Sequence, residues 1–178
     1  DLHCTPAYAD VQFVLLVTPS VIEIARQMVL DNGLNHHLVN VRPFLPQPEL
    51  AALLQSATAI ISPSQSDGTP NSMLEAMACG AFPVMGDLES IREWVDHGKN
   101  GLLFDPLNAN QLADCMRQAL DDVALRQQAQ EYNHALIQKR AAYHVMMPLA
   151  REFILQVAAT KGAKESFIEK ETDTEFKQ

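Results

Sequence analysis

The stretch from Ser62 to Val84, SPSQSDGTPNSMLEAMACGAFPV, decides the fold of this chain. The apolar run TAIIS at residues 58–62 predicts a buried strand that leads into it. A polar loop with glycine and proline follows, and the run from Pro70 to Cys79 has helical spacing and stops at a glycine. Phe82 to Met85 then predicts the next strand. The order strand, loop, helix, strand is typical of a parallel sheet with a crossover helix.

The same alternation extends on both sides of this stretch. Further strands are predicted at Val11–Val17, His37–Leu45 and Gly101–Phe104, and further helices at Val21–Leu30, Glu49–Gln55, around Ile91 to Val95, and Leu112–Leu120. Right-handed crossovers turn such a chain into an α/β, Rossmann-like, doubly wound parallel sheet flanked by helices. Ligands of such sheets bind outside the carboxyl ends of the strands, where the loop from Ser62 to Thr69 is expected.

The composition of the last third differs from that of the preceding residues. Residues 125–159 are helical in composition, and Pro148 is expected to break or kink this helical region. Residues 161–178 are highly charged with few apolar side chains, which predicts a flexible tail. We therefore expect one domain over residues 1–160 and a tail over residues 161–178.

Composition excludes several classes of protein. The chain has 178 residues, of which 47% are hydrophobic and 20% charged, as in a globular domain. A net charge of −9 without a basic cluster argues against nucleic-acid binding. No apolar run approaches the roughly 18 residues of a membrane span, and no signal peptide is apparent. Three scattered cysteines indicate reduced thiols in a cytoplasmic protein. The chain does not begin with methionine, so we expect a fragment of a longer protein.

The start of the helix after Pro70 has the chemistry of an anion site. The N–H groups of a first helical turn, here around Asn71, Ser72 and Met73, point toward the solvent and attract a diphosphate. Two carboxylates, Asp67 and Glu75, flank this turn. An ionised carboxylate accepts two hydrogen bonds from a vicinal diol. A ligand that combines a diphosphate with sugar hydroxyls fits both features.

A purely structural explanation of the same residues also exists. Ser72-x-x-Glu75 is the pattern of a capping box, in which the serine caps the helix and the glutamate reaches back. Asp67-Gly68 is a common turn pair. The residue types alone leave the two explanations open.

The run from Asp67 to Pro70 (DGTP), followed by Met73 to Gly80 (MLEAMACG), resembles the signature of a known family. That family is the retaining glycosyltransferases of the two-domain GT-B fold, glycosyltransferase family 4. Its signature is two acidic residues eight positions apart, with glycine and often proline after the first and an LEAMACG-like run around the second. The resemblance covers residues 11–121 in the order of elements and 44–105 in detail. It implies that the chain is the C-terminal, donor-binding half of such an enzyme.

The resemblance also implies roles for individual residues. Glu75 resembles the glutamate that binds the ribose hydroxyls of the nucleotide, and Asp67 resembles the catalytic acidic residue that contacts the transferred sugar. Most members have glutamate where this chain has Asp67, whose side chain is one methylene shorter. The other donor-binding positions would be Gly68, Thr69, Pro70, Asn71, Ser72, Met73 and Leu74, and the loop beside the nucleobase would be Arg42, Pro43, Phe44 and Leu45.

The implied activity is transfer of a hexosyl group from a nucleoside diphosphate sugar to an acceptor hydroxyl. No Asp-x-Asp follows an apolar strand, so no metal and no cofactor are expected. The family's diphosphate-clamping arginine and lysine, and its N-terminal acceptor domain, would precede this chain, so we expect the isolated domain to be inactive. A nucleotide-sugar epimerase of the same fold and a non-catalytic nucleotide-sugar-binding module are the alternatives.

The expected partners follow from the same resemblance. They are the nucleotide-sugar donor and the acceptor domain, and peripheral membrane contact of the full enzyme stays open. Tyr143, Met146, Met147 and Phe153 either pack on their own domain or form an exposed docking face, which would favour an oligomer.

Overall fold

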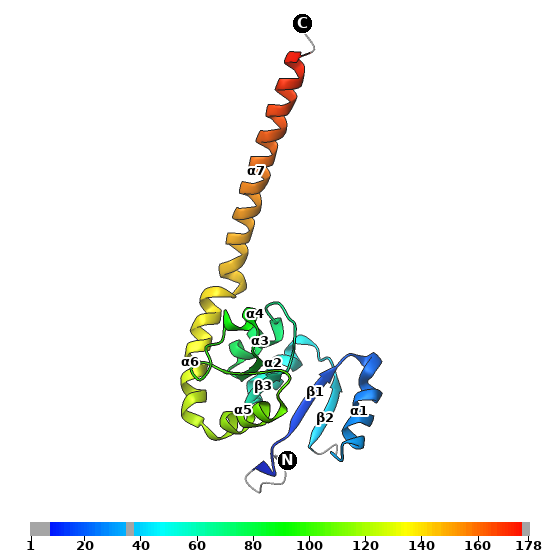
Figure 1. Cartoon of the computed structure of the whole chain (residues 1–178). Helices are drawn as coiled ribbons and strands as arrows, with labels where there is room; N and C mark the ends of the chain where they lie inside the picture. Colours follow the sequence, from blue (N-terminus) through cyan, green and yellow to red (C-terminus); the bar gives the residue numbers. More distant parts are fainter. Residues whose placement is uncertain (1–7, 35–37, 176–178) are drawn as a thin grey trace. The chain divides into compact units, whose positions relative to one another are not determined.

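The structure is a computed structural model that describes residues 8–34 and 38–175, with side chains described to residue 160 (Figure 1). The chain divides into two compact units, Asp1–Asn133 and His134–Gln178. The division of the chain after residue 160 stays a prediction.

The first strands form a small parallel sheet. β1 (Phe13–Val17) pairs with β2 (Val39–Pro43), with Phe13 opposite Val39 and Val17 opposite Pro43. A 3-10 turn (Pro19–Val21) and helix α1 (Ile22–Asp31) follow β1. These elements confirm the expected strand, helix, strand order with slightly shorter strands.

The second sheet is parallel and has the order β3-β4-β5. Its strands are β3 (Ala59–Ser62), β4 (Phe82–Gly86) and β5 (Leu102–Phe104). Helix α2 (Gln47–Ser56) precedes β3, α3 (Asn71–Cys79) joins β3 to β4, α4 (Glu89–Arg92) lies between β4 and β5, and α5 (Ala109–Asp121) follows β5. Gly80 ends α3 with a φ of 95°, a left-handed conformation that glycine adopts without strain.

The division into two sheets differs from the single sheet expected from the sequence. Over the described residues, β1 pairs with β2 alone and no ladder joins that pair to β3. In the doubly wound order 3-2-1-4-5-6, the first strand lies between the second and the fourth. The observed pair β2-β1 and the trio β3-β4-β5 match the two sides of that order, and its first strand has no counterpart among the described residues. The α/β class with parallel strands and flanking helices is confirmed.

Strand β4 is the centre of the core, because all five of its residues are buried. Phe82 and Val84 pack with Leu102 and Phe104 of β5. Buried residues of α5 and α6 (Val123–Arg140) cover the same cluster; they are Cys115, Ala119, Leu125 and Ala129. Helix α3 adds its own buried face of Met73, Ala76 and Met77.

Two asparagines form a buried polar link between the turn before β5 and α6. The side-chain amide of Asn100 donates to Asn133 Oδ1 at 2.8 Å and to the backbone oxygen of Trp94 at 2.9 Å. Its Oδ1 accepts from the backbone N–H of Asp96 at 2.7 Å, and Asn133 donates back to the Asn100 backbone oxygen at 2.9 Å. Both side chains are almost fully buried, so each bond replaces a contact with water.

The C-terminal unit contains the end of α6 and the long helix α7 (Tyr143–Glu175). Pro148 lies inside α7, so of the predicted break or kink the break is wrong, while the kink stays a prediction. The helical region is interrupted instead at residues 141–142, between α6 and α7. The backbone N–H groups of Ala141 and Ala142 both donate there to the backbone oxygen of Ile137, at 2.8 and 3.0 Å. Pro148 is the sixth residue of α7 and removes only one early backbone donor from it. The backbone is helical through residue 175, and the expected flexibility of residues 161–178 stays a prediction.

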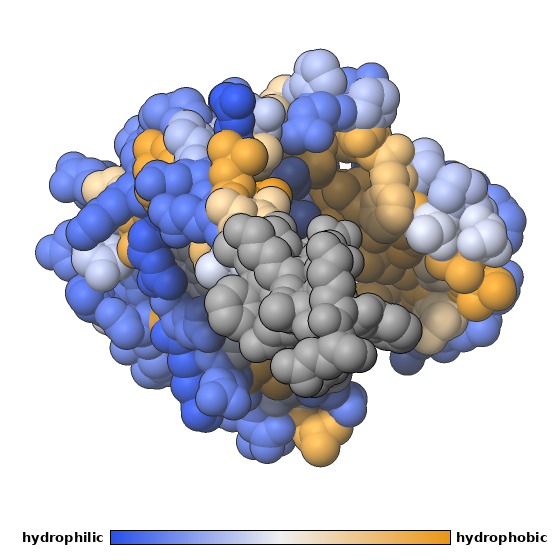
Figure 2. All heavy atoms as spheres, turned by 90° about the horizontal axis from the view of Figure 1, so that it is seen from above, coloured by the Kyte–Doolittle hydropathy of each residue, from blue (hydrophilic) through white to orange (hydrophobic). Residues whose placement is uncertain are grey.

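The side chains proposed as a docking face, Tyr143, Met146, Met147 and Phe153, are exposed. Figure 2 shows orange hydrophobic residues among the hydrophilic surface of the chain. Over the described residues, no helix combines the length and apolar character needed to cross a bilayer.

We expect Asn100→Ala to lower the free energy of unfolding by about 2–3 kcal/mol, because it leaves buried donors and acceptors unpaired. Asn110→Ala is the matched control, since Asn110 is exposed on α5 and its substitution costs at most about 0.5 kcal/mol. Urea denaturation followed by circular dichroism measures both. Equal losses in the two variants would contradict the importance of the buried link.

Candidate functional site

The candidate site lies at the carboxyl ends of β3 and β4. The chain leaves β3 at Ser62, passes through an exposed loop that contains Asp67, Gly68 and Thr69, and enters α3 at Asn71. Pro70 is buried at the N-cap of α3. Because β3 and β4 are parallel, this loop lies on the same sheet edge as the segment that follows β4.

The start of α3 does not form a capping box. Ser72 is the second residue of the helix, and no side chain caps the helix. The N–H groups of Met73 and Leu74 both donate to the backbone oxygen of Pro70, at 3.1 and 3.3 Å. Asn71 and Ser72 precede these first bonds, so their N–H groups are the donors left for an anion. Met73 anchors the helix through a fully buried side chain.

The two candidate carboxylates differ in exposure but share one property. Asp67 is exposed, while Glu75 on α3 is half-buried. Over the described residues, neither carboxylate makes a hydrogen bond or an ion pair with another protein group. Neither therefore contributes a polar contact to the fold, and both can accept hydrogen bonds from a ligand.

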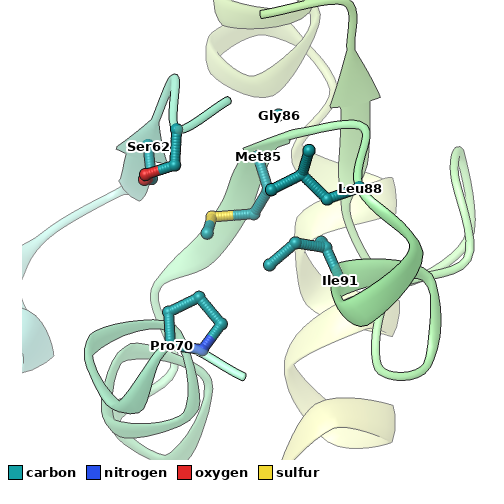
Figure 3. A pocket seen from close by; sticks show the side chains of 7 residues that line it. Ser62, Pro70, Met85, Gly86, Leu88 and Ile91 are labelled. Atoms are coloured by element: carbon teal, nitrogen blue, oxygen red, sulfur yellow. The ribbon is translucent and has the colours of Figure 1, made fainter. Parts of the chain in front are cut away.

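An apolar floor lies beneath the loop. Ser62, Ser64, Pro70, Met85, Gly86, Leu88 and Ile91 line a depression too small to hold a water molecule (Figure 3). The side chains of Met85, Leu88 and Ile91 gather there beside Pro70 (Figure 3). The floor supports the loop from below, and a ligand would have to bind above it.

The residues expected beside the nucleobase lie elsewhere in the fold. Arg42 and Pro43 are the last two residues of β2. Phe44, which is 62% exposed, and Leu45 follow them. They sit at the carboxyl end of a strand, as expected, but in the sheet that β1 and β2 form. The structure thus brings residues 67–75 together on the loop and α3, and the assignment of residues 42–45 stays a prediction.

An ion pair between Arg92 and Asp87 follows β4. Arg92 Nε donates to Asp87 Oδ1 at 2.6 Å, and its Nη2 donates to Asp87 Oδ2 at 2.7 Å. This two-point hydrogen bonding by Arg92 lowers the pKa of the Asp87 carboxyl. A carboxylate after a strand with an arginine five residues later is the pattern that could have indicated it.

Two side chains from the α4 region contact the loop. Ser90 Oγ donates to the backbone oxygen of Asp67 at 2.9 Å. Trp94 Nε1 donates to Thr69 Oγ1 at 3.4 Å. Sequence patterns do not reveal such contacts, because 23 and 25 residues separate the partners. In the part of the chain that the structure describes, no group of three or more His, Cys, Asp and Glu side chains could hold a metal ion.

Arg92→Gln should raise the pKa of Asp87 toward its usual range, because the charged donor is removed. The pair stabilises the fold above the ordinary carboxyl pKa, and this contribution is lost as the pH falls through the lowered value. A carbon-13 NMR titration of the Asp87 carboxyl measures the shift. Arg117→Gln removes an arginine paired with Asp114 instead and should leave the Asp87 curve in place. An unchanged curve in Arg92→Gln would disprove the assignment.

Comparison with known proteins connects this geometry to a family. The D-inositol 3-phosphate glycosyltransferase of Paenarthrobacter aurescens is 32% identical over 102 residues, which are 57% of this chain and 25% of that protein. The chain thus spans about a quarter of the length of this relative.

Two solved structures share the fold. Sucrose-phosphate synthase of Thermosynechococcus elongatus has a TM-score of 0.74 at 20% identity, covering 83% of this chain and 39% of its own. Anabaena HepE in complex with UDP and glucose has a TM-score of 0.71 at 18% identity, and the match covers 82% of this chain and 40% of the HepE chain. Residues 6–122 match the family described as Glycosyl transferases group 1. The chain belongs to this family of glycosyltransferases.

Proposed function

We propose that residues 67–75 bind the diphosphate and the sugar hydroxyls of a nucleoside diphosphate sugar. The observation that carries the proposal is the arrangement around the start of α3. Two carboxylates that make no hydrogen bond or ion pair with the described residues, Asp67 and Glu75, flank a helix start whose first N–H groups, at Asn71 and Ser72, lie outside the backbone ladder. Membership of the glycosyltransferase family supports the same ligand class. So does Anabaena HepE, which has been solved with UDP and glucose.

Each residue then has a separate task. The N–H groups of Asn71 and Ser72 and the positive end of α3 stabilise the charge of the diphosphate, which grows as the sugar departs. The Glu75 carboxylate accepts hydrogen bonds from the ribose, and the Asp67 carboxylate accepts them from the transferred sugar. Gly68 has no side chain, and a Cβ at this position would meet nothing within 4 Å, so a ligand can approach its backbone. None of these hydrogen bonds requires a metal ion.

The full-length protein would transfer the sugar to an acceptor hydroxyl with retention of configuration. Because this chain spans about a quarter of the length of the relative described above, the acceptor site is assigned to residues outside it. The isolated chain then binds the donor without transferring its sugar. The location that we propose is the cytoplasm, because Cys79 and Cys115 are free thiols and thiols stay reduced in that compartment.

Calorimetric titration of the chain with UDP, GDP, ADP and UDP-glucose tests the proposal. We expect one nucleotide to bind and Glu75→Ala to weaken it by about 1–3 kcal/mol, through loss of a charged hydrogen-bond acceptor. Glu49→Ala is the matched control, because Glu49 is an exposed glutamate in the first turn of α2. An equal loss in both variants would contradict the role of Glu75.

Gly68→Ala adds an independent measurement at the same site. The new methyl group meets no protein atom within 4 Å, so the thermal stability should stay unchanged while the affinity for the nucleotide sugar falls. If neither this chain nor the full-length protein binds any of the four ligands, the donor site does not exist. Binding by the full-length protein without sugar transfer would identify a non-catalytic binding module.

A further inference from the structure

The end of β4 and the segment that follows it approach the loop at three places that are four residues apart in sequence, Gly86, Ser90 and Trp94. Gly86 is buried, and a Cβ on it would lie 2.6 Å from the backbone oxygen of Ser64. Ser90 donates to the backbone oxygen of Asp67 at 2.9 Å, and Trp94 donates to Thr69 Oγ1 at 3.4 Å. The loop is thus contacted near its start, at its middle and near its end by one continuous segment.

These contacts matter because the loop has little else to order it. Over the described residues, no backbone-to-backbone hydrogen bond involves residues 65–69. These five residues are exposed, so burial does not order them either. Fixing the backbone of one residue costs about 1–2 kcal/mol of conformational entropy, and an untied loop of this length samples many conformations. The bonds from Ser90 and Trp94 are the polar contacts that oppose this freedom.

Ser90 acts on the residue that matters most. It donates to the backbone oxygen of Asp67, whose carboxylate makes no hydrogen bond or ion pair over the described residues. With the backbone fixed, only the two side-chain torsions of the aspartate remain free. A carboxylate on so short a side chain cannot compensate for a displaced backbone, since its reach is about one methylene less than that of a glutamate. The position of the Asp67 backbone therefore decides where the carboxylate lies.

We propose that Ser90 is a positioning residue for the donor sugar, and that with Gly86 and Trp94 it forms a clamp on the loop. This inference rests on the proposed function in that the sugar is the group which Asp67 contacts. The clamp orders the loop before the ligand arrives, so the cost of ordering is met during folding and not during binding. The apolar floor of Leu88 and Ile91 lies in the same segment and supports the loop from below.

The first test measures the loop in the protein without ligand. Nitrogen-15 relaxation of Ser90→Ala should show the order parameters of the Asp67 and Gly68 amides falling toward the flexible range, below about 0.6. Ser90→Thr keeps the hydroxyl and should restore them. Ser56→Ala is the matched control, because Ser56 is also a helical serine whose hydroxyl donates to a backbone oxygen, that of Leu53 at 2.8 Å. Unchanged order parameters in Ser90→Ala would overturn the clamp.

The second test separates positioning from structural support through two ligands. UDP lacks the sugar and UDP-glucose carries it, so the ratio of their affinities reports on the sugar contact alone. Ser90→Ala should reduce this ratio by about two- to tenfold, the value of one hydrogen bond, and leave the affinity for UDP unchanged. Ser90→Thr should restore the ratio. A mobile loop with an unchanged ratio would overturn the positioning role.

The two proposals fail in different ways. If the unsubstituted chain and the full-length protein bind neither ligand, the proposed function fails, while the relaxation data still decide whether the clamp exists. If the unsubstituted chain binds both ligands and Ser90→Ala behaves like Ser56→Ala in both tests, the clamp fails and the donor site stands.

Discussion

The burial of β4 on both faces is the constraint on which the rest of this fold depends. Its five residues are all buried, with β3 and β5 paired in parallel on its two sides. A strand enclosed in this way cannot shift its register without exposing apolar side chains to water. Its carboxyl end at Gly86 therefore has a fixed position, and so has the start of the loop after β3, because Ser62 lies opposite Met85. The buried strand β4 therefore fixes where the loop of the candidate site begins.

Polar groups divide sharply between those that stabilise the fold and those that are left for a ligand. Asn100 and Asn133 are buried and satisfy each other, and Asp87 is paired with Arg92 at two points. Asp67 and Glu75, by contrast, make no polar side-chain contact over the described residues. Asp67 is exposed and Glu75 is half-buried, so water can solvate both carboxylates in the absence of a ligand. The two carboxylates are therefore available to accept hydrogen bonds from a ligand.

The sequence predicted what depends on neighbouring residues and missed what depends on distant ones. The strand, loop, helix and strand around residues 58–86 were predictable because apolar runs and a terminal glycine lie within the segment itself. The gap between the β1–β2 pair and the other strands was not, since pairing depends on residues far apart in the chain. The capping box failed because the helix starts one residue before Ser72, at Asn71, and its ladder already begins at Pro70. The hydrogen bonds from Ser90 and Trp94 join residues more than twenty positions apart, so no local sequence pattern predicts them.

The parts of the candidate site differ in how firmly the fold holds them. In the proposed donor site, the diphosphate side is built on α3, whose Met73 and Met77 are fully buried, so its N–H groups cannot move without disturbing the core. The sugar side is an exposed loop that side-chain bonds hold in place, and such bonds are each worth only about 0.5–1.5 kcal/mol. Substitutions in the α4 segment can therefore alter sugar recognition while leaving the phosphate side intact. Within the proposed clamp, Ser90 and Trp94 lie outside β4, whereas Gly86 is its buried last residue, so only the first two can be exchanged without disturbing the strand.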